Sequence, residues 1–279
     1  MTRRWFYVVA LLAGWRGEVI AQQQFGDFTY GVNGDTVAIL DYPEPAKGNI
    51  VILATIDGKL VTSIGNNAFA YCALLTGITI PDSVTKISDN AFNQCTGLTT
   101  FTVGEGNPNY SVVDGILFNK DQSKLLQYPA GKAGGYSIPS HVTGIGSNAF
   151  YFSAGLASVT FSNSVTSIGP RAFANCSGLT SVTIPNSVTN IGQSAFANCA
   201  GLTSVKIGNG VNSIGNWAFI ECNKLTSVHF DGNAPKAGAG MFTGADIKEL
   251  KLHIYEGSTG FELPPWDVHA KNSIKHPAK

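Results

Sequence analysis

SVTSIGPRAFANCSGLTSVTIPN (residues 164–186) and SVTNIGQSAFANCAGLTSVKIGN (residues 187–209) are consecutive copies of one 23-residue sequence, and they decide the fold. The same frame recurs at 210–232 and, upstream, at 83–105 and 141–163. Each copy has an isoleucine, then a phenylalanine five residues later and a leucine six residues after that. The isoleucines are Ile64, Ile87, Ile145, Ile168, Ile191 and Ile214. A fixed period of this size predicts a solenoid, in which each unit is stable only when stacked on its neighbours.

The pattern inside one unit predicts which side chains face the core. In LTSVTI (residues 179–184), Leu179, Val182 and Ile184 point inward and the polar residues between them point outward, as in a strand. Residues 165–169 form a second short extended segment, and 170–175 is expected to make one helical turn that starts at a proline. The sequence therefore predicts a β-rich curved array with one parallel strand per 23-residue unit. Short turns or single helical turns are expected on its other side.

Breaks in the period divide the chain into segments. Residues 22–58 alternate apolar and polar side chains without matching the repeat, which predicts an N-terminal β cap. Residues 59–103 hold repeats 1–2, and a polar, turn-rich insert at 104–136 predicts a small β-meander. Repeats 3–6 follow at 137–231, and 232–279 loses the period and is expected to be a C-terminal cap and tail.

The first residues resemble an export signal. Arg3 and Arg4 precede an apolar run of about eleven residues, too short for the roughly 20 residues that cross a bilayer. We therefore expect a signal peptide over 1–21, with an uncleaved anchor as the alternative. The mature protein is expected to be secreted, or held at the cell surface or in the periplasm of a bacterium, with no transmembrane segment. Only 13% of residues are charged and the formal net charge is zero, which argues against nucleic acid as a partner.

The five cysteines share one repeat position, three residues before the leucine, and the sixth repeat has Ser153 there: Cys72, Cys95, Cys176, Cys199 and Cys222. This register predicts a buried column of thiols, with bridges such as Cys72–Cys95 or Cys176–Cys199 as the alternative. The five histidines and the carboxylates look scattered, and no catalytic, metal-binding or phosphate-binding motif is present. We expect no enzyme activity, no metal and no cofactor.

The outward strand positions form the candidate ligand site. The alternative is that Thr and Ser are there only as good strand formers that make hydroxyl ladders. The ligand-binding candidates are Thr79, Thr102, Ser158, Thr160, Thr180, Ser181, Thr183, Thr203, Ser204, Lys206, Thr226 and His229.

The frame C-x-x-L-x-x-V-x-I-P-x-x-V-x-x-I-x-x-x-A-F resembles the BspA-type leucine-rich repeats of bacterial surface and secreted proteins. It is carried by Cys176, Leu179, Val182, Ile184, Pro185, Val188, Ile191, Ala195 and Phe196, and by their equivalents over residues 59–231. The resemblance implies a curved solenoid with a parallel sheet, used outside the cytoplasm for adhesion or protein binding. It supplies no catalytic residues.

Two functions of different classes follow. The first is a non-enzymatic binding or adhesion module, whose concave Thr/Ser-rich face recognises an extracellular or surface protein, or a cell-surface glycan. The second is a structural envelope or matrix component that self-associates. A hydrolase site in the insert or the C-terminal segment is a third, weaker hypothesis.

Overall fold

The computed structural model describes residues 22–245, 248–262, 266 and 273–277. These residues form strands and turns, and none of them is helical. The chain divides into two compact units, with the boundary in sequence between Asp121 and Gln122. The predicted signal peptide lies outside the described residues. Of the described chain, no segment forms a helix long and apolar enough to cross a membrane.

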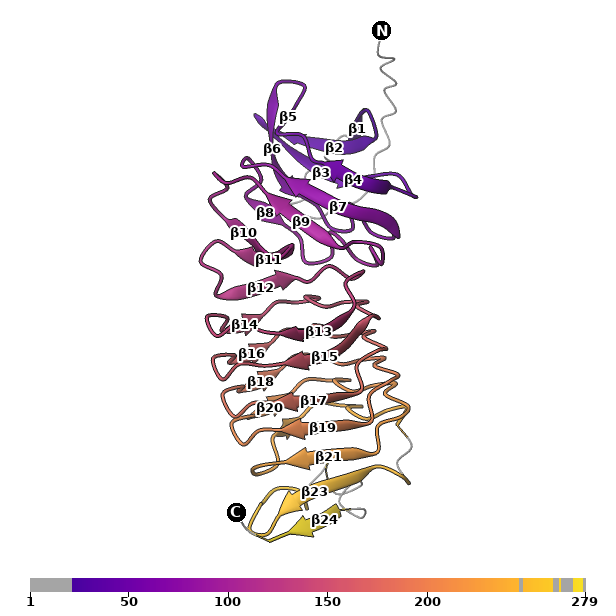
Figure 1. The fold of residues 1–279 in the computed structure, drawn as a ribbon, viewed down its shortest axis with the longest axis vertical. Helices are drawn as coiled ribbons and strands as arrows, with labels where there is room; N and C mark the ends of the chain where they lie inside the picture. The colour runs from indigo at the N-terminus through magenta and orange to yellow at the C-terminus, as the bar shows by residue number, and fades with distance from the viewer. Residues whose placement is uncertain (1–21, 246–247, 263–265, 267–272, 278–279) are drawn as a thin grey trace. The chain divides into compact units, whose positions relative to one another are not determined.

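The first unit begins with an antiparallel meander of β1, β2 and β3 and continues as parallel ladders (Figure 1). β3 pairs in parallel with β6, which pairs with β8, while β4, β7 and β9 form a second parallel ladder. β10 and β11 form an antiparallel hairpin around Asp114 and Gly115, which both have positive φ. The strands are β1 (Gln22–Phe25), β2 (Phe28–Asn33), β3 (Thr36–Asp41), β4 (Lys47–Val51), β5 (Thr55–Ile56), β6 (Lys59–Ile64), β7 (Leu74–Ile80), β8 (Lys86–Ile87), β9 (Thr100–Val103), β10 (Tyr110–Val113) and β11 (Ile116–Asn119).

The second unit is a regular stack of coils with two strands in each coil (Figure 1). One sheet runs β12-β14-β16-β18-β20-β22, and the longer strands form β13-β15 and β17-β19-β21-β23-β24. The strands are β12 (Lys124–Gln127), β13 (Gly134–Ser137), β14 (Gly144–Ile145), β15 (Leu156–Thr160), β16 (Ser167–Ile168), β17 (Ser181–Ile184), β18 (Asn190–Ile191), β19 (Ser204–Ile207), β20 (Ser213–Ile214), β21 (Ser227–Phe230), β22 (Lys236–Ala237), β23 (Lys251–Tyr255) and β24 (Ser273–His276).

Equivalent residues of successive coils stand directly beside one another. Val182 pairs with Val205 and Val205 with Val228, so the parallel register advances by one 23-residue unit per coil, as the sequence predicts. Leu179, Val182 and Ile184 are buried, and the residues between them are exposed. The ladders continue beyond residue 231, because β22 pairs with β20 and β23 pairs with β21. The core of this unit is therefore a set of columns, each built from one repeat position.

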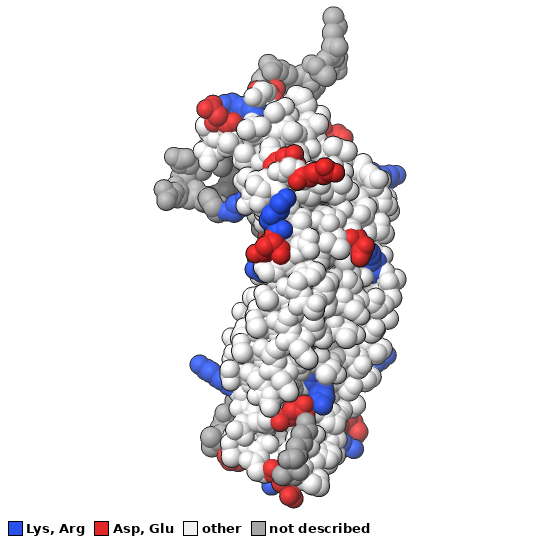
Figure 2. Space-filling model, turned by 60° about the vertical axis from the view of Figure 1, so that its left-hand side comes forward, with Lys and Arg blue, Asp and Glu red and all other residues white. Residues whose placement is uncertain are grey.

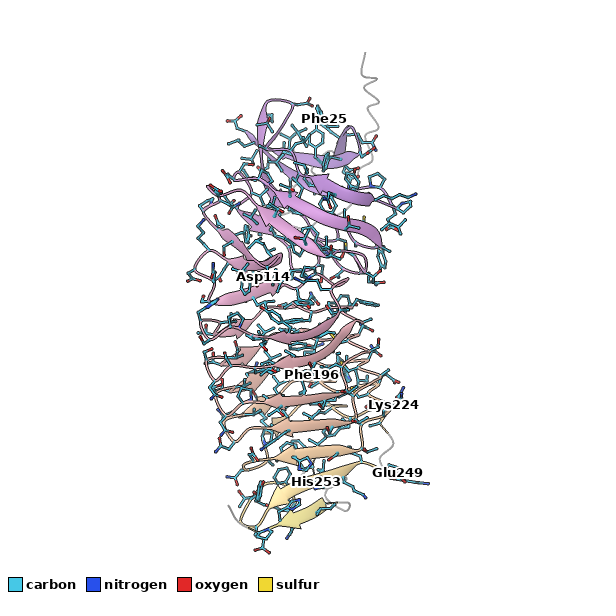
Figure 3. The ribbon with its side chains drawn as sticks, viewed as in Figure 1. Phe25, Asp114, Phe196, Lys224, Glu249 and His253 are labelled. Carbon is cyan, nitrogen blue, oxygen red and sulfur yellow. The ribbon has the colours of Figure 1, made fainter. Side chains whose placement is uncertain are left out.

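The phenylalanine column shows this packing most clearly. The ring centroids of Phe150 and Phe173 are 4.6 Å apart, and those of Phe173 and Phe196 are 5.1 Å apart with an interplanar angle of 2°. The column continues through Phe219 to Phe242. Figure 3 shows Phe196 in the interior of the stack. Such rings bury a large apolar area, so this column contributes much of the free energy that holds the coils together.

The segment around each phenylalanine is a turn, so the helical turn predicted for residues 170–175 is wrong. Arg171 and Asn175, two residues before and after Phe173, have φ of 54° and 63°, in the left-handed region that an α-helix excludes. Alternate backbone amides of this turn bond to the next coil: Phe173 N–H donates to Ala195 O at 2.7 Å. The amides between them bond three residues back within their own coil, as Ala174 N–H does to Arg171 O at 3.1 Å. Cross-coil bonding replaces the i→i−4 bonds of a helix because it links every turn to its neighbour.

The cysteine column is a ladder of free thiols. All five cysteines are buried and unbridged. Each thiol from Cys95 onward donates to the carbonyl of a phenylalanine one coil earlier; Cys176 Sγ, for example, lies 3.1 Å from Phe150 O. Burial raises the pKa of Cys95 and of Cys176 to about 12. Such thiols remain protonated and weakly nucleophilic, as a structural column requires.

Candidate functional site

The outward side chains of β15, β17, β19 and β21 form a surface that we call the Thr/Ser face. It is built from rows, because each strand places the same repeat position beside its neighbour. One row is Ser181, Ser204 and Ser227, in the register of the parallel ladder. The adjacent row begins with Thr183 on β17 and Lys206 on β19, which lie side by side in the parallel register.

A further row of threonines flanks these strands and is tied to the backbone. Thr203 Oγ1 donates to Thr180 O at 3.1 Å, and Thr226 Oγ1 lies 3.5 Å from Thr203 O. Thr166 and Thr189, in the column of short strands, bond in the same way: Thr189 Oγ1 lies 3.2 Å from Thr166 O. Hydroxyl ladders are therefore a general property of these coils, and a threonine in a row is not by itself evidence of a ligand site. Each bonded hydroxyl keeps its lone pairs as acceptors.

The predicted ligand-binding residues lie on the outward faces of the parallel ladders. Thr79 on β7 pairs with Thr102 on β9 in the first unit, and the remainder lie in the second unit. Three of them are half-buried: Thr79, Ser204 and His229. The others are exposed: Thr102, Ser158, Thr160, Thr180, Ser181, Thr183, Thr203, Lys206 and Thr226. None of the twelve is buried, and their role in binding a ligand stays a prediction.

The repeats of the second unit carry very little charge. No aspartate or glutamate occurs from residue 122 to residue 220, and Arg171 is the only arginine or lysine between Lys132 and Lys206. Figure 2 shows one side of the molecule, with a broad stretch almost free of charged side chains. A ligand that contacts these repeats would therefore meet mainly hydroxyl groups and methyl groups. The next charged residue after Arg171 is Lys206, whose Nζ lies 3.2 Å from an oxygen of Asp231.

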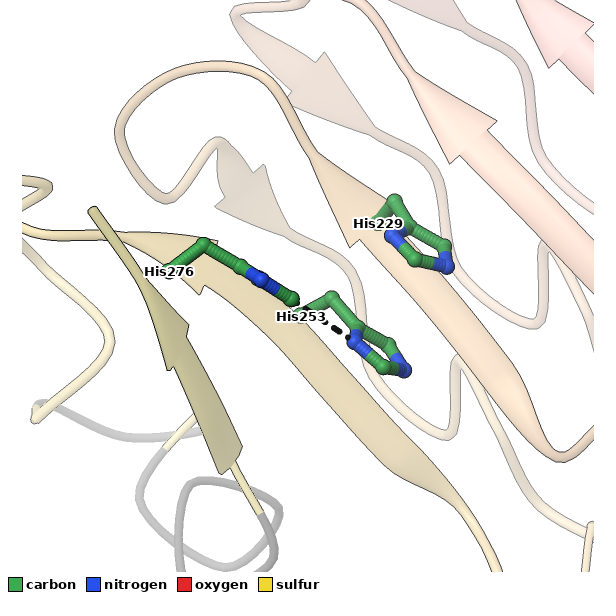
Figure 4. Close-up of side chains that lie close together, drawn as sticks. All are labelled: His229, His253 and His276. Carbon is green, nitrogen blue, oxygen red and sulfur yellow. Dashed lines mark hydrogen bonds between the residues drawn. The ribbon is translucent and has the colours of Figure 1, made fainter. Parts of the chain in front are cut away.

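The end of the Lys206 row holds a cluster of three histidines (Figure 4). His229 on β21 follows Lys206 in register and pairs with His253 on β23, and His276 on the neighbouring strand β24 completes the cluster. The rings of His229 and His253 are stacked, with centroids 4.0 Å apart and planes at 11°. His253 Nδ1 and His276 Nε2 are 3.0 Å apart, which is hydrogen-bond distance. One ring nitrogen from each histidine lies within 4.8 Å of the other two.

The surroundings of the cluster favour neutral rings. The pKa values of His229 and His253 are both lowered, with burial as the largest cause and the neighbouring imidazoles next. Lys206 adds to this effect at His229 and Lys251 at His253, while Asp231 opposes it at His229. Neutral imidazole is the form with a lone pair for a metal ion or a hydrogen-bond donor.

The expectation that the histidines are scattered is therefore wrong for three of the five. Among the candidates, only His229 belongs to the cluster, and sequence reasoning missed His253 and His276. A signal was present: the three lie 24 and 23 residues apart, close to the repeat period. After residue 231 the repeat keeps its phenylalanine, Phe242, but has Ala237 at the isoleucine position and Lys248 at the leucine position, so the spacing of the histidines did not stand out. The pairing of β23 with β21 and β24 reveals it.

Comparison with known proteins agrees with the repeat fold of this chain. A family model described as BspA type leucine rich repeat region matches in six copies, over residues 54–123 and 137–256. No curated protein matches the chain. Two similar solved structures are a leucine-rich repeat protein from Eubacterium ventriosum ATCC 27560 and a leucine rich cell surface protein from Faecalibacterium prausnitzii A2-165.

The first is 21% identical with a TM-score of 0.52, and the alignment covers 79% of this chain and 93% of that one. The second is 20% identical with a TM-score of 0.51, covering 80% and 96%. The pneumococcal vaccine antigen PcpA is 17% identical with a TM-score of 0.53, covering 92% and 98%. At these identities the likeness extends to the fold alone.

Proposed function

We propose, from the premise that this chain belongs to the BspA-type leucine-rich-repeat family, that it is an exported, non-enzymatic module which binds a protein through its Thr/Ser face. The family consists of repeat proteins whose parallel sheets present extended binding surfaces. Export is supported by the signal-like pattern at residues 1–21, and one structural neighbour is described as a cell surface protein.

The observation that carries the proposal is the exposed, regular array of polar side chains on β15, β17 and β19. Thr160, Thr183 and Lys206 are all exposed, as is Ser181, and the parallel register holds β17 and β19 at a fixed spacing. A rigid array loses little conformational entropy on binding, which favours complex formation. The side chains offer hydroxyl donors and acceptors, so the complementary surface must supply hydrogen-bonding groups of its own.

A protein fits this face better than a glycan does. Among the described strands β15, β17 and β19, no outward residue has an aromatic ring on which a sugar ring could stack. A polar protein surface needs no such platform, because backbone and side-chain amides can bond directly to threonine and serine hydroxyls.

The test is a binding screen of the chain against extracellular-matrix proteins and bacterial cells, with a panel of glycans run in parallel. The test variant is Thr180→Glu combined with Thr203→Glu, which places two bulky charges in the threonine row that flanks the Thr/Ser face, one residue before β17 and one before β19. Glutamate at an interface costs desolvation without a partner, so we expect saturable binding to a protein to fall at least about tenfold.

The matched control is Thr166→Glu combined with Thr189→Glu. These threonines are also exposed, and each makes the same bond to the carbonyl of the preceding coil, but they lie in the column of short strands. The control should therefore lose as much stability as the test variant and keep its binding. Equal binding by the two variants, or binding to glycans alone, would refute a protein site on this face.

A further inference from the structure

We propose that His229, His253 and His276 form a binding site for a divalent first-row transition cation, with Zn²⁺ as the ion best matched to it. The site goes beyond the Thr/Ser face and differs from the sequence prediction of no metal. It is carried by the convergence of three imidazoles from three adjacent strands, β21, β23 and β24.

The donor set determines the class of ion. Imidazole nitrogen suits Zn²⁺, Cu²⁺ and Ni²⁺, whereas Ca²⁺ and Mg²⁺ take oxygen ligands. The nearby carboxylate, Asp231, is held by Lys206 in an ion pair of 3.2 Å, so the site is dominated by neutral nitrogen donors. Three imidazoles leave one tetrahedral position for water or for a ligand from outside the chain.

The distances require only a small adjustment of the rings. Zn–N bonds of about 2.0–2.1 Å in a tetrahedron place neighbouring ligand nitrogens about 3.3 Å apart. His253 Nδ1 and His276 Nε2 are 3.0 Å apart and share a hydrogen bond, so the ring that donates this bond must move its proton to its other nitrogen before both atoms can bind the ion. One ring nitrogen from each of the three residues lies within 4.8 Å of the other two. The rings of His229 and His253 must turn out of their parallel stack for their lone pairs to converge. All three side chains are half-buried, so each is partly exposed to solvent.

Ser227 supplies support for one ligand. Its hydroxyl lies 3.0 Å from His229 Nε2, on the same strand and the same face. When Nε2–H donates to this hydroxyl, Nδ1 of His229 carries the lone pair that binds a metal. Hydrogen bonds of this kind fix the ring orientation of metal-binding histidines. The lowered pKa values of His229 and His253 are consistent with neutral rings at pH 7.

A bound ion would join β24, the last described strand, to β21 and β23. Because β24 contributes His276 and follows residues 267–272 in the chain, the ion would tie this end to β21 and β23. Binding to the folded state alone stabilises that state by mass action, in proportion to the logarithm of ion concentration above the dissociation constant.

Calorimetric titration of the full-length, untagged chain with Zn²⁺ tests the proposal. We expect one equivalent to bind, and His229→Gln and His253→Gln each to weaken binding at least about tenfold. His141→Gln is the matched control, because His141 is exposed and outside the cluster. Thermal unfolding without metal shows whether each variant is folded. Titration with Co²⁺ adds a second readout, since the visible absorption of a tetrahedral Co²⁺ site should disappear in the same two variants.

Two results would overturn the proposal. One is the absence of Zn²⁺ binding by the folded, unsubstituted chain. The other is binding that survives in folded His229→Gln and His253→Gln to the same degree as in His141→Gln, which would place the ion elsewhere. In either case the three rings would be a stacked hydrogen-bonded cluster without a metal.

Discussion

Ser153 occupies the repeat position that cysteine holds in the other five copies, and its environment differs from theirs in one respect. Its hydroxyl is buried, and it has no hydrogen-bond partner among the described residues. The equivalent thiol of Cys176 donates to Phe150 O at 3.1 Å. A buried hydroxyl without a partner costs about 1–3 kcal/mol, whereas a thiol is a weaker donor and is less costly to bury. Sulfur therefore suits this column better than oxygen.

We predict that Ser153→Ala increases the free energy of unfolding by about 1 kcal/mol, because it removes the unpaired hydroxyl and little volume. Chemical denaturation of the two proteins measures the difference. Ser187→Ala is the matched control: the Ser187 hydroxyl donates to Val165 O at 2.7 Å, so its removal should decrease stability. A loss of stability in Ser153→Ala would show that its hydroxyl has a partner.

At the scale of the element, the turn around each phenylalanine depends on left-handed backbone at fixed positions. Ser194, two residues before Phe196, has φ of 54°, and its N–H donates to Asn216 O at 2.9 Å. The equivalent position two residues before Phe242 is Gly240, with φ of 61°. The repeat tolerates an L-residue here at a cost of about 1–2 kcal/mol, because the cross-coil hydrogen bonds hold the turn in place.

Ser194→Pro should destabilise the protein by about 3 kcal/mol or more, since proline fixes φ near −65° and removes the N–H that reaches Asn216. Ser194→Gly keeps the N–H and accepts positive φ, so it should leave stability unchanged or raise it by about 1 kcal/mol. Denaturant midpoints for the two variants measure the contrast. If both variants lost equal stability, side-chain contacts of Ser194 rather than its backbone conformation would control the turn.

At the scale of the whole molecule, the repeats place a buried cysteine thiol at the same position of several coils. Burial is the largest cause of the raised pKa of Cys72, Cys95 and Cys176. The pKa of Cys199 is raised by its hydrogen bond with Cys222 and then by burial. In the unfolded chain a thiol loses its proton near pH 9, whereas folded Cys95 and Cys176 keep theirs to about pH 12. The stabilisation from these thiols is complete below pH 9 and is lost as the pH rises toward 12.

We therefore predict that the free energy of unfolding falls between about pH 8 and about pH 10, and that Cys176→Ala shows a smaller fall than the unsubstituted chain. The comparison between the two proteins isolates the thiol, because tyrosines and lysines titrate alike in both. Denaturation curves at the two pH values provide the measurement. An identical fall in both proteins would mean that Cys176 titrates in the same range folded and unfolded.

Much of the architecture follows from sequence alone, for a physical reason. Leu179, Val182, Ile184 and Phe173 recur every 23 residues, and only a stack of equivalent coils buries such a set in continuous columns. The periodicity therefore determined the solenoid, the parallel register, the inward and outward faces and the buried thiols. The same pattern could not give the conformation of the turn at Arg171, because the partner of its backbone N–H, Gln193 O, lies on the next coil.

The tertiary structure alone decided which polar residues meet. His253 and His276 follow the last clear repeat, where the hydrophobic frame no longer marks the register, and their neighbours are set by the pairing of β21, β23 and β24. Local sequence determines which face of a strand a side chain occupies, since that depends on a period of two. Which strand lies beside it depends on the packing of segments that are far apart in the sequence. This pairing brings three separated histidines into a cluster with ring nitrogens within 4.8 Å of one another.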